Sequence, residues 1–216
     1  MHHKNDYIWY VSYGSNLLRQ RFMVYIAGGR APGGTRDQPG CSDHTPPIKD
    51  EAIEIPNDIY FGGEAMVYSC GAFIALQPGP KPTKARAYLI TTEQFWQVVQ
   101  QENNWPHPIK RPSISSIRQH GTAVLQDIGG EYAQFTRIIY CGEKAGYPML
   151  SFTAEHQHDE VKKPSDIYLQ VMAQGLAESH GLTATQIAQY LADIPGAAGA
   201  YTLPELIKAL STVIDS

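Results

Sequence analysis

Hydrophobic residues near the N-terminus follow two periods, first that of a strand and then that of a helix. Residues 7–12 are β-branched or aromatic, and this run predicts a β-strand that ends at the turn of Gly14. Beyond the turn, apolar residues recur at three- and four-residue steps at Leu18, Phe22 and Tyr25. This spacing predicts a helix over 16–26.

The middle of the chain combines an irregular segment with short strand-like runs. Residues 27–60 contain repeated glycine and proline with little periodicity, which predicts a long irregular insertion. Further on, Gln77–Pro80 is typical of a turn between two strands. The predicted strands are 64–69, 72–76, 84–90, 121–126 and 135–141.

Helix start signals occur once in the middle of the chain and repeatedly near its end. Thr91 and Gln94 have the spacing of a capping box, and the apolar stripe behind them predicts a helix over 91–103. Another helix is predicted over 165–179. The same capping logic gives helix starts at Ser165, Thr183 and Thr202.

The order of these elements favours an α+β fold. Strands dominate the middle and helices the last quarter, without the regular alternation of a doubly wound sheet. We expect a single domain over 1–216, with the irregular insertion 27–60 and a helical C-terminal part 164–216.

Charge and composition narrow the classes of partner. The 216 residues include 17 Lys and Arg against 21 Asp and Glu, a net charge of −4. Nucleic-acid binders are usually basic, so nucleic acid is not an expected partner. No window approaches the run of about 18 apolar residues that a membrane span needs, so no membrane partner is expected.

Three cysteines without close pairs favour a reducing compartment, and we expect a cytoplasmic protein.

The first candidate site is the turn Tyr13–Asn16, directly after a predicted strand and before a predicted helix. Gly14 permits a tight turn, and Ser15 and Asn16 are both good helix N-caps. The free backbone N–H groups of the first helical turn would form a nest for a carboxylate, a phosphate or an oxyanion. The alternative interpretation is a capped turn with no ligand.

The second candidate is Glu102, on the same helix face as the apolar stripe that begins at Phe95. An ionised carboxylate on such a face is costly, and partial burial would raise its pKa toward neutrality. Such a group suits general acid–base catalysis. The alternative interpretation is that the helix frays at Asn103 and Glu102 turns to water.

These two signals and a late helix resemble the gamma-glutamylcyclotransferase-like family. The family's Tyr-Gly-Ser-Asn loop after the first strand corresponds to the run Tyr10–Leu17. Its catalytic glutamate closes a helix behind a central strand, as Glu102 does behind residues 87–92. Its late Pro-Ser-x-x-Tyr helix with glycine spacing corresponds to a third block: Pro164, Ser165, Tyr168, Gly175, Gly181 and Leu182.

The resemblance implies a small mixed β-barrel with flanking helices and a cavity at its mouth. It also implies a reaction in which the α-amine of a γ-glutamyl amide attacks its own side-chain carbonyl. The products are 5-oxoproline and a released amine or amino acid, and no cofactor or metal is needed because the nucleophile belongs to the substrate. Glu102 would be the general acid–base. The substrate-binding residues implied are Tyr13, Gly14, Ser15, Asn16 and Tyr168.

The sequence departs from the family at two places and leaves rival functions open. Asn103 follows Glu102 where the family usually has glycine, and residues 27–60 exceed what a minimal cyclotransferase needs. One rival is an amide hydrolase or deacylase that uses water as the nucleophile on the same site. The other is a non-catalytic module that binds a small ligand.

Two other side-chain pairs suggest different chemistry. Cys41 and His44 are close in sequence, as a cysteine hydrolase needs them to be in space. His156 and His158 would point the same way on a strand and could share a metal, but a metal site needs further ligands. We expect neither a nucleophilic cysteine nor a metal centre.

Overall fold

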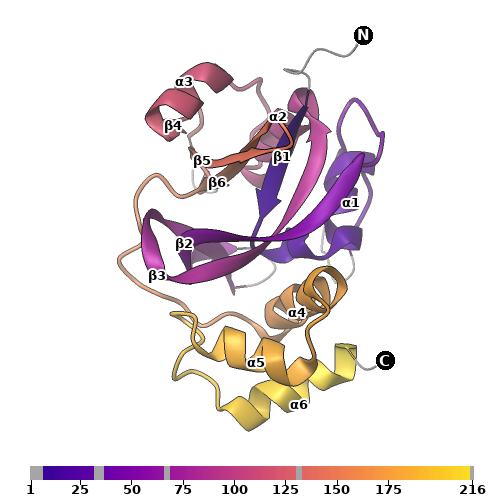
Figure 1. Ribbon diagram of the computed structural model, residues 1–216, viewed down its shortest axis with the longest axis vertical. Coiled ribbons are helices and arrows are strands. Elements are labelled where there is room, and N and C mark those ends of the chain that lie inside the picture. Colours follow the sequence, from indigo (N-terminus) through magenta and orange to yellow (C-terminus); the bar gives the residue numbers. More distant parts are fainter. Residues whose placement is uncertain (1–6, 32–36, 66–68, 130–132, 215–216) are drawn as a thin grey trace.

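The computed structural model describes residues 7–31, 37–65, 69–129 and 133–214. Its centre is a six-stranded mixed sheet with helices against both faces (Figure 1). The strand order is β2-β3-β1-β6-β5-β4, and only the pairing between β1 and β6 is parallel. In chain order the strands are β1 (Tyr7–Ser12), β2 (Lys49–Ala65), β3 (Ser69–Thr91), β4 (Thr122–Val124), β5 (Arg137–Lys144) and β6 (Tyr147–Thr153).

The mixed α+β class is confirmed, but the sheet is not a closed barrel. Strands β2 and β4 are its two edges, and no strand pairing joins them in the described parts of the chain. Strand β4 has three residues and β2 has 17, so one edge offers too few backbone groups to close on the other. The far end of β2 instead makes an isolated antiparallel bridge, between Gly62 and Val161.

Strands β2 and β3 form one long hairpin, which corrects two predictions. The predicted irregular insertion 27–60 ends early, because β2 begins at Lys49. The predicted turn Gln77–Pro80 lies inside β3, opposite irregularities in the register around Asn57. A proline has no N–H for the ladder, so a proline-rich stretch is accommodated at such a bulge. There the Asn57 side chain donates to the Ala75 carbonyl at 2.9 Å.

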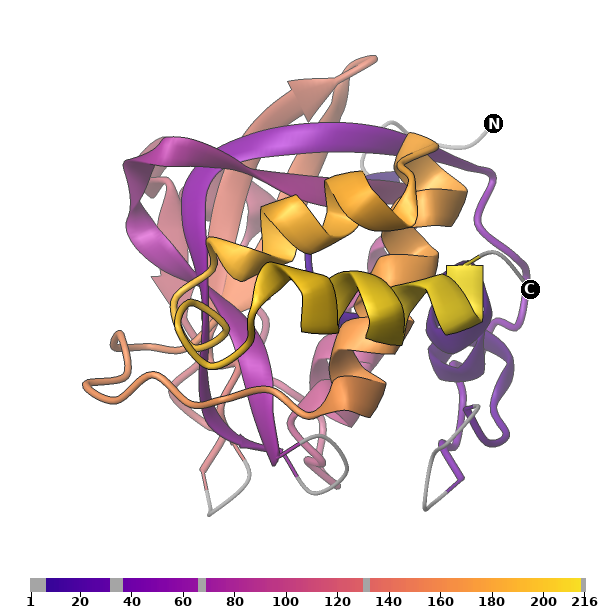
Figure 2. The ribbon, with the colours of Figure 1, turned by 90° about the horizontal axis from the view of Figure 1, so that it is seen from below.

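The helices form two groups, one on each face of the sheet. One group consists of α1 (Arg19–Ala27), α2 (Thr92–Glu102) and α3 (Ile114–His120), and the other of α4 (Asp166–His180), α5 (Ala184–Ala192) and α6 (Leu203–Ile214). Figure 2 shows the second group lying across one face of the sheet. Alternate residues of β1 enter different cores: Ile8 and Tyr10 pack with the first group, whereas Trp9 and Val11 pack with the second.

Most predicted helix starts are confirmed by their caps. Capping boxes join Thr91 to Gln94 and Thr183 to Gln186, and the Ser165 hydroxyl caps α4. The helix predicted over 16–26 is wrong at its start, because a 3₁₀ turn, η1 (Ser15–Leu17), precedes α1. Helix α3 and strand β6 were not predicted. None of the described helices is long and apolar enough to cross a bilayer.

Candidate active site

Gly14, in the turn after β1, is needed because neighbouring side chains pack close to it and not because of an unusual φ. Gly14 has φ −110°, so the left-handed conformation that favours glycine is not used here. A Cβ at this position would lie 3.0 Å from the Tyr168 hydroxyl and 3.6 Å from the Ala72 Cβ. Gly14 therefore lets the site loop, residues Gly14–Leu17, pass directly beside α4 and β3.

The site loop is not capped in the predicted way. Gly14 is the N-cap of η1, and neither Ser15 nor Asn16 caps a helix with its side chain. The N–H groups of Leu17 and Leu18 donate to the carbonyls of Gly14 and Ser15 at 3.0 and 3.2 Å. Among the described residues, nothing accepts a hydrogen bond from the backbone N–H of Ser15 or Asn16. The turn expected to begin an α-helix is therefore a 3₁₀ turn, and the binding role of its N–H groups stays a prediction.

Glu102 meets the site loop through the side chain of Asn16. It is the last residue of α2 and is half-buried. Asn16 Nδ2 donates to Glu102 Oε1 at 2.7 Å and lies 3.2 Å from the Tyr10 hydroxyl. Residues 86 positions apart are therefore joined by one charge-assisted hydrogen bond. The alternative in which Glu102 turns to water at a frayed helix end is wrong.

Asn16 carries an acceptor that the protein itself leaves unused. Its side chain is 3% exposed, and Oδ1 is buried with no hydrogen-bond partner among the described residues. An unsatisfied buried polar atom costs about 1–3 kcal/mol, so the site gains when an N–H donor reaches this oxygen. The assignment of Oδ1 and Nδ2 follows the network, because the reverse orientation would set two acceptor oxygens 2.7 Å apart when Glu102 is ionised.

Asn103 explains how the helix ends without the family's glycine. Its φ is −88°, and the left-handed position falls instead on Asn104, with φ 48°. The Asn103 carboxamide accepts from the Phe135 N–H at 2.8 Å and donates to the Phe135 carbonyl at 2.9 Å. These two bonds fix the end of α2, and with it the backbone of Glu102.

Three buried tyrosines surround the carboxylate. Burial raises the pKa of Tyr10, Tyr13 and Tyr25 well above the ordinary value, and the negative charge of Glu102 adds to the effect in each case. The phenols therefore stay neutral. Arg21 Nη2 donates to the Tyr25 hydroxyl at 3.0 Å, and that hydroxyl is hydrogen-bonded to Glu102. A guanidinium, a phenol and a carboxylate thus form a chain from α1 to α2.

Tyr13 and Tyr168, the two tyrosines predicted to bind substrate, lie beside the site loop, and the hydroxyl of each makes a hydrogen bond within the protein. Tyr13 donates to the Phe152 carbonyl at 2.6 Å, and Tyr168 accepts from the Ala72 N–H at 3.0 Å. Both side chains are buried. The structure brings them together with Gly14, and their role in substrate binding stays a prediction.

Three residues that contact the Glu102–Asn16 pair or continue its network were missed by the sequence analysis: Tyr10, Arg21 and Tyr25. Tyr10 begins the run that resembles the family's loop, and in the structure it also packs in the core by stacking on Phe152 at a centroid distance of 5.3 Å. Arg21 and Tyr25 are spaced i, i+4 on α1, so their contact was available from the sequence.

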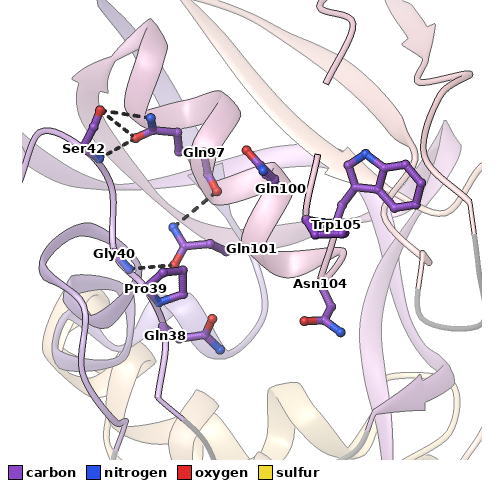
Figure 3. A pocket seen from close by; sticks show the side chains of 10 residues that line it. Gln38, Pro39, Gly40, Ser42, Gln97, Gln100, Gln101, Asn104 and Trp105 are labelled. Carbon is purple, nitrogen blue, oxygen red and sulfur yellow. Dashed lines mark hydrogen bonds between the residues drawn. The ribbon is translucent and has the colours of Figure 1, made fainter. Parts of the chain in front are cut away.

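A cavity of about 400 Å³ lies beside the C-terminal half of α2, on a side that Glu102 does not line (Figure 3). Its polar wall is formed by side-chain carboxamides, several of which fasten the segment 38–42 to the helix. Gln97 Oε1 accepts from the Ser42 N–H at 2.8 Å, and Gln101 Oε1 accepts from the Gly40 N–H at 3.3 Å. The cavity therefore lies between the segment 38–42 and α2.

Cys41 is a packed thiol rather than a nucleophile. It is 3% exposed, and burial raises the pKa of its thiol to about 12. Its Sγ lies 3.2 Å from the Tyr25 carbonyl, and no described contact joins it to His44. Because the thiolate is the reactive form, we expect Cys41 to resist iodoacetamide at pH 8 in the native protein and to react in urea. Peptide mapping by mass spectrometry measures this, and rapid native alkylation would contradict it.

The two histidines considered as metal ligands are used separately. The backbone N–H of His158 donates to the Tyr60 hydroxyl at 3.2 Å, and its ring packs on Phe73. His156 is exposed and lies 3.6 Å from Glu155. Within the described residues, no group of three or more His, Cys, Asp or Glu side chains is arranged to hold a metal.

The architecture is that of the gamma-glutamyl cyclotransferase fold. A solved structure of a gamma-glutamyl cyclotransferase matches with a TM-score of 0.51 and 13% identity, covering 94% of this chain and 99% of that chain. The structure of an uncharacterised protein from Homo sapiens matches with a TM-score of 0.50 and 16% identity, again over 94% and 99%. At this identity the likeness establishes the fold, and the resemblance seen in the sequence is confirmed at that level.

Comparison of the sequence with known sequences finds a relative of low identity. No family model matches the chain. The chain is 25% identical over 201 residues to histone deacetylase 5 of Arabidopsis thaliana, which covers 85% of this chain. The match spans only 30% of the length of that relative.

Proposed function

We propose that this protein cyclises a γ-glutamyl amide to 5-oxoproline and releases an amine or amino acid. The observation that carries the proposal is the hydrogen bond between Asn16 and Glu102, which joins the loop after β1 to the end of α2 in a gamma-glutamyl cyclotransferase fold. The proposed partner is a small γ-glutamyl or related amide, and the scheme uses no cofactor.

The proposed chemistry uses the side chains of Glu102 and Asn16. The α-amine of the substrate attacks the γ-carbonyl carbon, forming a C–N bond and a tetrahedral intermediate. Glu102 takes a proton from the attacking nitrogen and returns it to the leaving nitrogen as the original amide C–N bond breaks. Asn16 Oδ1, buried and unpartnered, supports the proposal as an acceptor for an N–H of the attacking amine.

The backbone donors of the site loop complete the proposed machinery. The N–H groups of Ser15 and Asn16 would stabilise the oxyanion that develops on the γ-carbonyl oxygen. Tyr25 donates to Glu102 and is itself polarised by Arg21. The carboxylate is thereby oriented by hydrogen bonds from Asn16 and Tyr25.

Three matched substrates test the proposal. With a γ-glutamyl amide, we expect 5-oxoproline and free amine in equal amounts, measured by mass spectrometry. The α-linked isomer should give no product, because its amide carbonyl is not placed for five-membered ring closure. The N-acetylated γ-glutamyl amide should also be inert, since its nucleophile is blocked.

The same assay separates the rival functions. An amide hydrolase or deacylase would release free acid and would still act on the N-acetylated substrate. A binding module would show a thermal shift with the amide and no product. Either result, obtained reproducibly with folded protein, would contradict the cyclisation.

A further inference from the structure

Arg86 is a buried charge on β3 that reaches the site loop. Its side chain is 5% exposed, and Nη1 donates to the Leu17 carbonyl at 3.1 Å. The guanidinium also pairs with Asp50 of β2, through Nε at 2.7 Å, and with Glu178 of α4 at 3.1 Å. A planar fork of donors can make these contacts together, which a lysine ammonium cannot.

Tyr88, two residues further along β3, holds the neighbouring carbonyl of the loop. It is fully buried, and its hydroxyl donates to the Asn16 carbonyl at 2.8 Å. Its ring is stacked on Phe22 of α1 with centroids 4.1 Å apart, and the Arg86 guanidinium lies over the same ring at 5.2 Å. The packing of the ring against Phe22 and Arg86 therefore restricts the position of the hydroxyl.

The charges around Arg86 are balanced across four elements. Arg19, the first residue of α1, contacts Asp50 with its side chain at 3.3 Å and Glu178 with its backbone N–H at 3.2 Å. Two cations and two anions thus join α1, β2, β3 and α4 around the end of the site loop. A buried ion cluster is weak evidence for stability, because desolvation offsets the attraction. Its contact with a loop carbonyl gives it a second role.

We infer that Arg86 and Tyr88 are positioning residues, which fix the backbone of Asn16 and Leu17 so that the Asn16 side chain meets Glu102. Asn16 has a short side chain, so a rotation of its peptide plane would move Nδ2 away from Glu102 Oε1. Two successive carbonyls are held from the same strand, and that strand is anchored on both sides by β1 and β2. The consequence for turnover rests on the function proposed above, whereas the positioning itself does not.

Two variants test the two residues, and Tyr88→Phe removes both the bond to the Asn16 carbonyl and a longer contact, 3.4 Å, with the Leu17 carbonyl. Tyr88→Phe deletes only the hydroxyl, and Arg86→Lys keeps the charge but loses the fork. The control is Lys84→Met, on the same strand and the same face, which removes the 2.8 Å ion pair with Glu54 without touching the loop. If Arg86→Lys does not fold, Tyr88→Phe carries the test alone.

The first readout needs no substrate. The side-chain amide protons of Asn16, followed by ¹H–¹⁵N NMR, report the bond to Glu102. We expect them to move toward the chemical shifts of a free carboxamide in Tyr88→Phe and Arg86→Lys, and to stay unchanged in Lys84→Met. Unchanged Asn16 amide shifts in a folded Tyr88→Phe protein would overturn the inference, whatever the protein catalyses.

The second readout is turnover of a γ-glutamyl amide. A misplacement of about 1 Å can cost on the order of 10²-fold, and we expect a loss of roughly that size in kcat/KM for each positioning variant. In an Asn16→Ala background the same changes should have no further effect on kcat/KM, because they act through Asn16. Fully additive losses would overturn the positioning role. No turnover by the wild-type protein would refute the proposed function while the NMR result still decides the positioning.

Discussion

Glu102→Gln is expected to abolish most of the turnover while the fold is retained. The glutamine keeps a carbonyl oxygen that can accept from Asn16 Nδ2, so the 2.7 Å contact survives, but no proton can be taken or returned. General acid–base assistance typically contributes about 10²–10⁴-fold, and a loss of that order in kcat is expected. Steady-state kinetics and a thermal melt of the same preparation measure both quantities.

Glu93→Gln is the matched control for this prediction. Glu93 lies in the first turn of the same helix and pairs with Arg111, with Nη2 and Oε1 2.7 Å apart. Its contacts do not include the site loop, so turnover should change little. If Glu102→Gln retains wild-type turnover, another group moves the proton and the proposed mechanism is wrong.

Gly175→Ala is expected to destabilise the protein, although alanine is normally the better helix residue. Gly175 lies inside α4, where helix propensity alone would favour alanine by about 1 kcal/mol. Here, however, an added Cβ would lie 2.6 Å from the Leu17 Cβ and still closer to the backbone atoms of Leu17 and Leu18. Since backbone cannot move aside cheaply, we expect a net loss of about 1–3 kcal/mol in the free energy of unfolding.

Thermal and urea unfolding of this variant give the measurement. The melting temperature should fall by roughly 2–4 °C for each kcal/mol lost. Gly129→Ala is the control, because no described atom lies within 4 Å of the Cβ it would add, and a surface change of this kind stays within about 0.5 kcal/mol. A Gly175→Ala protein as stable as the wild type would show that α4 does not press on the site loop as described.

Local signals in the sequence predicted the start of α2 and the helix face on which Glu102 lies. Thr91 and Gln94 define the start of α2 through hydrogen bonds between residues only three positions apart. Local chemistry alone therefore determines where the helix that carries Glu102 begins. The face on which Glu102 lies follows from helical period, and the structure indeed turns it toward the loop at Asn16.

Features that depend on long-range pairing were not predictable in the same way. The proline-rich stretch of β3 looks like a turn locally, and only its pairing with β2 keeps it extended. Closure of the sheet depends on the lengths of β2 and β4, which are far apart in sequence. Gly14 was expected for its backbone freedom, whereas the requirement comes from Tyr168, more than 150 residues later.

The pairing of β1 with β6 and the contact of Gly175 with Leu17 also set the order in which the molecule can be completed on the ribosome. The site loop is translated well before its neighbours in α4, because about 150 residues of the chain lie between them. Glu102 is translated between the two, so the nascent chain contains the carboxylate before α4, which packs against the site loop, has been made. Folding must therefore wait for contacts of high sequence separation, which close slowly because the intervening chain has to be ordered first. A chain stalled before residue 164 would present the apolar underside of the sheet, with Trp9 and Val11, to the solvent.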